Sequence, residues 1–502
     1  MNELKNLHTA ETQDTSYDHV LKYTGVFGGV QGLKMVINMV RVKLTALILG
    51  SVGVGLISAY NSVFEFLVNA SSMGIPLNAT RQTGQLFEEG TEEQIRHQVM
   101  VIRTWVVWSA LLSVVICLLF SPLISYFFFD EDWHRWPEVM LTSLVALSNI
   151  VAEGECAILK GLRQVRKVAI IETSLAFITL LCTIPLYYLF GLHGVIFGLI
   201  ACGFMSAVMH FSFSLRLVSY RVRPLSRSTF VEGLPLIKVG IPYVLAGVAN
   251  SFVPMIISAI ILMHHSMADL GHYQAGWSIM VAYAGLVFVA LEADYFPRLS
   301  SVANDRQRMN STINQQMDVC TLIITPLLIL LILFMPQLLM LLYKEEFLVV
   351  TGMATISVFY TFLRCMSLPM GYSVLAKGHS IAYLVLEVCY DIFFGLLIWW
   401  CYDTWGLRGA GVAYSIGALY DVVVNFLYCH YRYGFSLRRS TLLLYLMQLV
   451  CLTAAVIVLT LFPSDAVMKY VGTGLTFCAS VAVSCYWLSR RSAYVGRLFR
   501  RK

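Results

Sequence analysis

Charged residues are scarce in this sequence, and that scarcity excludes a water-soluble globular protein. Of the 502 residues only 13% are charged and 58% are hydrophobic, and the mean hydropathy is +0.72. Soluble domains carry about 25% charged residues. Apolar runs of about 20 residues recur from end to end, and a helix of that length crosses a hydrocarbon core about 30 Å thick. Because these runs are too long and uniformly apolar for barrel strands, the sequence predicts an all-α, polytopic membrane protein.

Sequence signatures of enzymes and of metal or redox sites are also missing. The twelve cysteines include no CxxC pair and are scattered mostly within apolar runs, so we expect them to be small core residues. There is no Walker motif, no HExxH and no GxSxG. No loop is long enough for the catalytic segment of a glycosyltransferase or polysaccharide polymerase. We therefore expect no enzyme activity, no cofactor, no metal site and no nucleic-acid partner.

The apolar runs predict fourteen transmembrane spans joined by short connections. The first twenty residues are polar and lack an apolar segment, so we expect no cleavable signal peptide and a plasma-membrane location. The predicted spans are 22–48, 53–79, 99–125, 138–159, 168–190, 194–218, 236–263, 272–296, 318–343, 349–376, 380–402, 408–431, 440–462 and 467–489.

Basic residues set the predicted orientation. With the N-terminus in the cytoplasm, 23 of the 35 lysines and arginines fall in cytoplasmic segments and only four fall on the outer side. Cytoplasmic loops of membrane proteins carry an excess of Lys and Arg. We therefore predict that both termini are cytoplasmic.

The sequence contains an internal repeat. Leu49-Gly50 and Pro76 recur 221 residues later, as Leu270-Gly271 and Pro297. AILKGLRQ (157–164) is echoed by VLAKGHSI (374–381), and GLHGVIFGLI (191–200) by GLRGAGVAYSI (406–416) at an offset of 215. Paired halves in membrane transporters form two lobes that move around a central site. The predicted divisions are a tail (1–21), an N-lobe (22–233), a C-lobe (234–436) and a terminal span pair with a basic tail (437–502).

The first predicted span carries a polar stripe. At 100° per residue, Gln31, Lys34, Asn38 and Arg41 lie within about 80° of one another. A Lys or Arg at the centre of a membrane helix costs about 2.5–3.5 kcal/mol. The stripe is therefore expected to line a water-filled cavity, and the alternative is a buried ion pair within one lobe. Lys43 points the other way and is placed to snorkel toward the outer surface.

Other charged residues within spans are candidate site residues. Lys238 begins the seventh span, where either interfacial anchoring or a cavity position fits, and Arg364 lies within the tenth. Glu387 and Asp391 are four residues apart and share a helix face, and they form, with Glu65, the candidate coupling site.

Two further charged residues have expected roles outside the candidate sites. Arg103 is expected to anchor its span at the membrane edge. Glu172, which maps onto Glu387 at the offset of 215, is either functional or a structural partner of a neighbouring basic residue.

A cationic cavity favours an anionic ligand. Arg presents a planar fork that matches phosphate oxygens, and Lys presents a point charge. The headgroup phosphates of a lipid could bind there while its acyl or prenyl tail stays in the bilayer. The substrate-binding candidates are Lys34, Arg41, Lys43, Asn38, Arg364 and Lys238.

Several ordered motifs resemble the Wzx-type O-antigen flippases of the MOP (multidrug/oligosaccharidyl-lipid/polysaccharide) exporter superfamily. They are GLKMVINMVRVKLTALILGSVGVGLISAY, then SSMGIPLNATRQ, then ILKGLRQ, and the GLHG and GLRG turns, over about residues 20–435. Many such translocases end at twelve spans, so the last two spans of this chain depart from that pattern. A total of fourteen spans is similar to that of the related lipid II flippases. Lys34 and Lys43 match family positions, whereas Arg41 matches none.

The resemblance implies a MATE-like transporter with two lobes in the bacterial inner membrane. It would flip an undecaprenyl-diphosphate-linked glycan, an O-antigen or capsule repeat unit, from the inner to the outer leaflet. Candidate partners are the bilayer, polysaccharide polymerase or assembly proteins, and coupling protons or sodium ions. One alternative is a cation-coupled multidrug or small-molecule exporter of the same superfamily, and another is a scaffold protein of a glycan-assembly complex.

Overall fold

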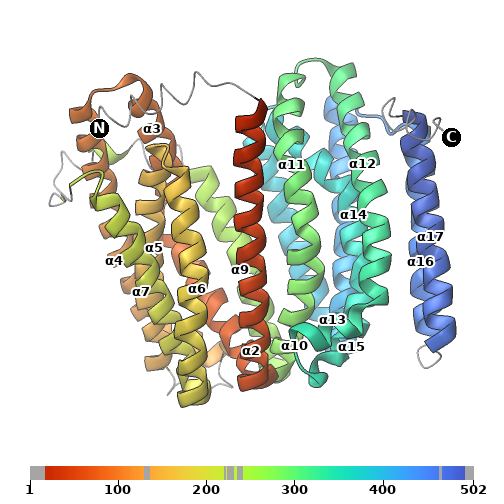
Figure 1. Ribbon diagram of the computed structural model, residues 1–502, viewed down its shortest axis with the longest axis horizontal. Coiled ribbons are helices and arrows are strands. Elements are labelled where there is room, and N and C mark those ends of the chain that lie inside the picture. Colours follow the sequence, from red (N-terminus) through yellow and green to blue (C-terminus); the bar gives the residue numbers. More distant parts are fainter. Residues whose placement is uncertain are drawn as a thin grey trace. The chain divides into compact units, whose positions relative to one another are not determined.

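The computed structural model describes residues 17–128, 136–219, 222, 231–234, 241–462 and 466–491 (Figure 1). Every regular element in these ranges is helical. The chain divides into two compact units, residues 1–271 and 272–502. The lobe boundary expected after residue 233 stays a prediction.

The first unit contains helices that pack mainly around α5. This helix contacts α3, α4 and α7, whereas α2 lies against α6 and α9. The elements are α2 (Tyr17–Ser71), α3 (Ile75–Glu89), α4 (Glu92–Phe128), α5 (Trp136–Gly161), α6 (Val165–Phe190), η2 (Gly191–His193), α7 (Gly194–Leu215) and α9 (Ile241–His264).

The second unit is built around α14 and α15, which pack along each other, and α12, which contacts α14. α10 (Met267–Trp277) crosses the division at residue 271 and leads into this unit. The remaining elements are η3 (Ser278–Tyr283, π-helical), α11 (Ala284–Ser301), α12 (Arg306–Leu333), α13 (Met335–Leu342), η4 (Glu345–Val349), α14 (Val350–Ala376), α15 (Ser380–Tyr433), α16 (Arg439–Leu461) and α17 (Ala466–Arg491).

The helices reproduce the predicted spans. Nine helical runs in the described ranges are long and apolar enough to cross a membrane. Three of them turn at a glycine into two rods each, and α9 and the α10–η3–α11 segment supply two more. Each of the fourteen predicted spans overlaps one rod, which confirms the all-α, polytopic fold class. The span expected at 318–343 starts inside α12 and continues over α13, because α12 begins at Arg306 and ends at Leu333. The span expected at 53–79 is shorter, because α2 ends at Ser71 and the backbone turns at Gly74 (φ 69°).

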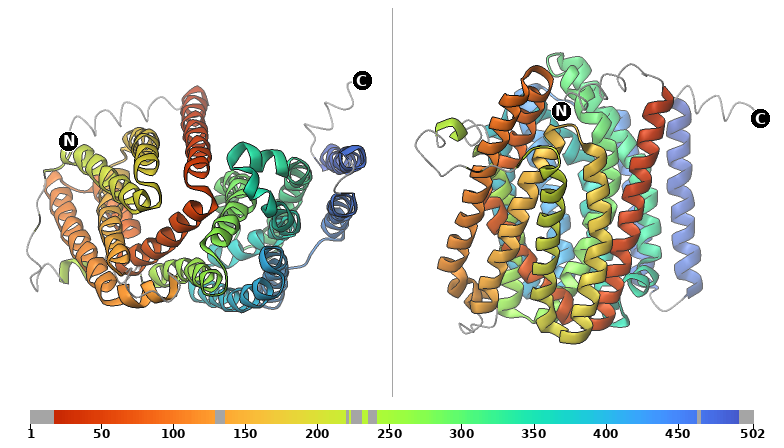
Figure 2. Two further views of the ribbon diagram at one scale, coloured as in Figure 1. Left: turned by 90° about the horizontal axis from the view of Figure 1, so that it is seen from below. Right: turned by 60° about the vertical axis from the view of Figure 1, so that its left-hand side comes forward.

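Three turns between consecutive rods share a GxxG pattern. Gly50, Gly191 and Gly406 have φ of 65°, 56° and 57° and ψ of −165°, −133° and −140°, a backbone region that only glycine enters readily. Three residues later a second glycine is required for space, because a Cβ at Gly194 or Gly409 would overlap a carbonyl oxygen of the preceding rod. Figure 2 shows the first of these turns in α2.

The ends of α5 and α14 reveal the register of the repeat. After α5, Arg163 has φ 59° and the Gln164 amide donates to the Leu159 carbonyl oxygen. After α14, Gly378 has φ 74° and the next amide donates to the carbonyl oxygen five residues back. Both are Schellman-type helix ends, and they are related by an offset of 215, as are Gly191 and Gly406. The echo that pairs Lys160 with Lys377 is therefore displaced by two residues from the structural equivalence.

The last two helices form a pair (Figure 2) that packs against α12, and buried polar groups link the three helices. Gln448 on α16 is 0% exposed and bonds Ser480 and Ser484 on α17. The Ser484 hydroxyl in turn donates to the Leu322 carbonyl oxygen at 2.9 Å. Because these polar groups satisfy one another, a Gln and two Ser residues can be buried within apolar helices.

Candidate substrate-binding and coupling sites

The polar stripe of α2 lies on the better covered side of its rod. Lys34, Asn38 and Arg41 are half-buried, whereas Val36 and Val40 are exposed. α2 packs against α6 and α9. The apolar side is therefore the one left for lipid, as the cost of exposing cations to hydrocarbon requires.

Lys34 is paired with an acid of α6. Its Nζ donates to Glu172 Oε2 at 2.6 Å, and the two side chains are 33% and 39% exposed. The other carboxylate oxygen, Oε1, lies 3.9 Å from Nε2 of His210 on α7. The sequence was compatible with two roles for Lys34: a cation that lines a cavity, or a member of an ion pair within one lobe. In this conformation the pair is formed, and a third of each side chain remains accessible.

Arg41 lies on the same side of α2, two turns beyond Lys34. It is within electrostatic range of Tyr187 on α6 and Cys202 on α7. It forms no ion pair with any carboxylate in the parts of the chain that the structure describes. Arg41 is thus the stripe cation that is best placed to accept an external anion.

The remaining candidates of the first unit fall into three situations. Lys43 is half-buried and takes part in a polar or electrostatic interaction. Glu65 is exposed on the second rod of α2. Lys238 lies outside the described residues, so its role stays a prediction.

The second unit places Arg364 among aromatic and acidic groups of α14 and α15. Its Nη1 donates to the Tyr360 hydroxyl at 2.7 Å, and its guanidinium lies 5.6 Å from the centroid of the same ring. Arg364 is also within electrostatic range of Asp421 and Glu387. Asp421 accepts a hydrogen bond of 2.6 Å from Asn425.

Glu387 and Asp391 lie one turn apart on α15, as predicted. Both are half-buried and interact electrostatically with each other. Asp391 Oδ2 is buried and has no hydrogen-bond partner among the residues of known position. Two neighbouring carboxylates with an unsatisfied oxygen can hold a proton or a small cation.

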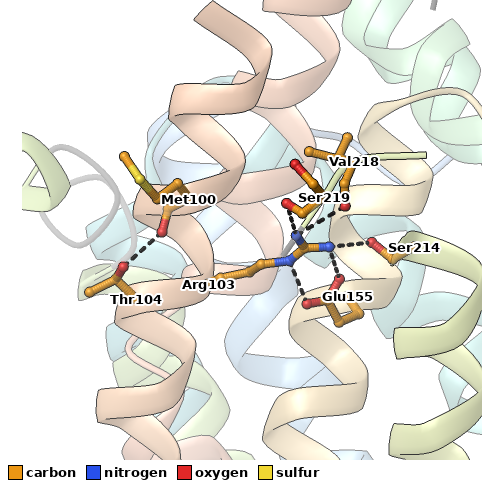
Figure 3. Close-up of polar contacts among 7 residues, drawn as sticks. All are labelled: Met100, Arg103, Thr104, Glu155, Ser214, Val218 and Ser219. Carbon is orange, nitrogen blue, oxygen red and sulfur yellow. Dashed lines mark hydrogen bonds and ion pairs between the residues drawn. The ribbon is translucent and has the colours of Figure 1, made fainter. Parts of the chain in front are cut away.

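Arg103 is not the interfacial anchor expected from its place at a span edge. It is 2% exposed and forms a two-pronged ion pair with Glu155 on α5, with distances of 2.8 and 3.0 Å (Figure 3). The guanidinium also donates to Ser214 Oγ and to the carbonyl oxygens of Val218 and Ser219. All five guanidinium hydrogens therefore have acceptors, which allows a buried cation to join α4, α5 and the end of α7.

Sequence reasoning found the charged members of these clusters but missed two uncharged ones. His210 lies in an apolar helix, and only the packing of α6 and α7 brings it to Glu172. Tyr360 lies one turn before Arg364 on α14, so the spacing of four residues could have indicated that contact. At the offset of 215, Glu172 and Glu387 occupy equivalent positions in their helices. Within the described ranges no three His, Cys, Asp or Glu side chains group as metal ligands would.

A model of the family described as polysaccharide biosynthesis protein matches residues 44–351. No curated protein matches the sequence. The fold is similar to that of the lipid II flippase MurJ in an inward closed conformation, at 15% identity and a TM-score of 0.64 over 92% of this chain and 98% of that one. An inward-facing multidrug resistance MATE transporter of the MOP superfamily has the same identity and TM-score over 80% of this chain and 94% of its own.

A third solved structure is a MOP superfamily transporter from Pyrococcus furiosus, described as having a reversed polarity of its binding pocket. It is 14% identical, with a TM-score of 0.52 over 82% of this chain and 93% of that chain. These likenesses establish that the chain has the fold of MOP superfamily transporters.

Proposed function

We propose that this chain, which belongs to the polysaccharide biosynthesis protein family, is a flippase that moves a polyprenyl-diphosphate-linked oligosaccharide across the bacterial inner membrane. The cargo is an O-antigen or capsule repeat unit that passes from the inner to the outer leaflet by alternating access of the two sequence-related halves. Both termini are cytoplasmic in this proposal, and the basic loops contact the inner leaflet.

The observation that carries the proposal is the cationic stripe on the covered side of α2. Arg41 is half-buried without a carboxylate partner in the described part of the chain, and Lys34 is a third exposed beside it. A half-buried guanidinium of this kind calls for a counter-anion, because an uncompensated charge away from water is costly. The diphosphate supplies that anion, with bidentate bonds to Arg41 and a point contact to Lys34.

Binding must favour one conformation if it is to drive transport. A ligand that binds two conformations equally shifts neither. We propose that the diphosphate neutralises the stripe and so permits the inward-open form to close. After release, the empty cationic site returns with help from the membrane potential, which contributes about 2.3 kcal/mol per charge per 100 mV.

The coupling ion is proposed to bind at Glu387 and Asp391. Their adjacent carboxylates and the unsatisfied Asp391 Oδ2 favour a proton or a sodium ion. In proteoliposomes, Glu387→Gln or Asp391→Asn should abolish transport driven by the ion gradient while ligand binding remains. Asp403→Asn removes an exposed acid from the same helix and serves as the matched control. Unchanged gradient dependence in both test variants would contradict this assignment.

The flippase proposal is tested by replacing Lys34 and Arg41 singly with Ala in cells whose surface glycan depends on this protein. A lost charge-assisted hydrogen bond of about 1.5–3 kcal/mol weakens ligand binding by about tenfold or more. Glycan export should fall accordingly, whereas Arg96→Ala, which removes an exposed cation of α4, should export normally. Normal export by well-expressed Lys34 and Arg41 variants would defeat the proposal.

A second candidate function is export of a cationic drug or small molecule. It is favoured by the acidic residues of α15 and by the fold shared with a multidrug resistance transporter. Binding of a short prenyl diphosphate and of a lipophilic cation to the purified protein separates the two. Tight binding of the cation, unaffected by Lys34→Ala, would favour the second function.

A further inference from the structure

Three ionisable side chains from three helices of the first unit form a row. Lys34 Nζ on α2 donates to Glu172 Oε2 on α6 at 2.6 Å, and Glu172 Oε1 lies 3.9 Å from His210 Nε2 on α7. The row runs from an accessible end to a buried one, since Lys34 and Glu172 are about one-third exposed and His210 is 3% exposed.

The buried end of the row has room for one more proton. His210 Nδ1 lies 2.9 Å from the Ser206 carbonyl oxygen, which can only accept, so Nδ1 carries the hydrogen. A neutral imidazole then presents a lone pair at Nε2, and this buried atom has no hydrogen-bond partner within the described ranges. The carboxylate of Glu172 and the Nε2 lone pair cannot bond each other. One added proton, on either group, would create a hydrogen bond between them.

The second half of the repeat lacks this arrangement. At the offset of 215, Glu172 corresponds to Glu387, but His210 corresponds to Asn425. The Asn425 amide is already occupied, because it donates to Asp421 at 2.6 Å. The imidazole is therefore a specialisation of the first half and not a packing feature that both halves need.

We infer that Glu172 is a tethered anion that holds Lys34 while the substrate site is empty and moves to His210 when a diphosphate takes Lys34. This inference rests on the proposed function. The diphosphate replaces one carboxylate at the Lys34 ammonium, and the released carboxylate forms a hydrogen bond with His210 Nε2 through a proton taken from solvent. The proton returns to solvent when the diphosphate leaves and Glu172 pairs with Lys34 again.

The surroundings of His210 make the uptake of that proton specific to the released state. The charged groups that act on His210 are Glu172 from α6 and Lys160 and Glu155 from α5. Glu155 is already neutralised by its two bonds to Arg103. Glu172 can change its distance to the imidazole when the substrate binds, because its other oxygen is held by Lys34, a partner that the diphosphate can displace.

The test uses the purified full-length protein and a short-chain prenyl diphosphate as the probe. Glu172→Gln removes the competing anion, so the probe should bind about tenfold more tightly than to the wild type, which corresponds to about 1.4 kcal/mol. Glu153→Gln removes an exposed acid from α5 and should change the affinity less than twofold. Calorimetry in two buffers of different ionisation enthalpy should show uptake of about one proton more by the wild type than by Glu172→Gln or His210→Gln.

The outcomes separate this inference from the proposed function. If Lys34→Ala binds the probe as well as the wild type, the proposed function fails at its binding site. If Lys34→Ala binds weakly but Glu172→Gln binds no more tightly than the wild type, only the tethered anion is overturned. Equal proton uptake by wild type and Glu172→Gln would also overturn it, since any proton bound by the probe itself is common to both. Glu172→Asp keeps the charge but shortens the side chain by one methylene, which weakens its hold on Lys34, so this variant should also bind the probe more tightly than the wild type.

Discussion

The ion pair of Arg103 and Glu155 gives the most quantitative prediction. Arg103 is 2% exposed, and two of its five donated hydrogen bonds go to Glu155. Glu155→Gln keeps the side-chain volume but leaves a buried guanidinium without a counter-charge. Breaking a buried pair in this way costs about 3–5 kcal/mol. The free energy of unfolding should fall by that amount, measured by denaturant titration of the protein in detergent.

The double variant Arg103→Met/Glu155→Leu tests the reason. Replacing both partners with apolar side chains removes the desolvation cost of two charges. The buried carbonyl oxygen of Val218 then loses its donor, at about 1–3 kcal/mol, whereas that of the exposed Ser219 can bond to water. The double variant should be more stable than Glu155→Gln, although it also lacks the hydrogen bonds from Arg103 to Ser214, Val218 and Ser219.

A matched control lies on the same helix. Arg96 and Glu92 of α4 form an exposed pair at 2.6 Å and a spacing of four residues. Such helix pairs contribute about 0.3–0.5 kcal/mol. The reasoning is refuted if Arg96→Met and Glu155→Gln lower stability equally, or if the double variant is less stable than the single one.

Two further predictions concern the backbone and the last helix pair. Gly406→Ala should lower stability by about 1–3 kcal/mol, because the φ of Gly406 is 57°. Gly395→Ala on the same helix should be neutral or slightly stabilising, and neither added Cβ meets another atom within 4 Å, so the two variants differ only in backbone conformation. Thermal unfolding of both variants in detergent compares them, and equal midpoints would contradict the turn assignment. Gln448→Leu should lower the free energy of unfolding by about 0.6–1.7 kcal/mol, because the Ser480 hydroxyl loses its acceptor. Met447→Leu on the exposed side of α16 should leave the unfolding midpoint unchanged. A midpoint unaffected by Gln448→Leu would show that the polar contacts do not hold the pair together.

The fold was predictable because lipid leaves few choices. The lengths of the apolar runs predicted the number of rods. The GLHG and GLRG motifs predicted two of the turns, because each turn needs a positive φ at the first glycine and has no room for a Cβ at the second. The span expected at 53–79 overran the end of α2 at Ser71, because apolar residues resume at Met73 and Ile75 after the Ser71-Ser72 pair, and the turn at Gly74 separates the two segments.

The pairing of charges was predictable only in part. The helical stripe placed Lys34 and Arg41 on one face, but nothing in the spacing says which acid on which helix meets which cation. Glu172 is 138 residues from Lys34, and Glu155 is 52 residues from Arg103. Such contacts depend on the packing of α2 with α6 and of α4 with α5, which the sequence pattern of each helix does not encode. Arg103 was misjudged for this reason, because its position near a span edge fits an anchor as well as a buried clamp.

The repeat suggests how one ancestral position serves two kinds of ion. Glu172 and Glu387 occupy the same place in equivalent helices, seven residues after α6 and α15 begin. In the first half a lysine neutralises the acid, and Arg41 adds positive charge two turns along α2. In the second half Asp391 lies one turn from the acid, and Asp421 and Arg364 both act on it, so carboxylates outnumber cations around this position. We propose that the same helix position serves an anionic ligand in one half and a cation in the other. An Ala substitution at residue 34 should then impair diphosphate binding without changing the ion dependence proposed for residues 387 and 391.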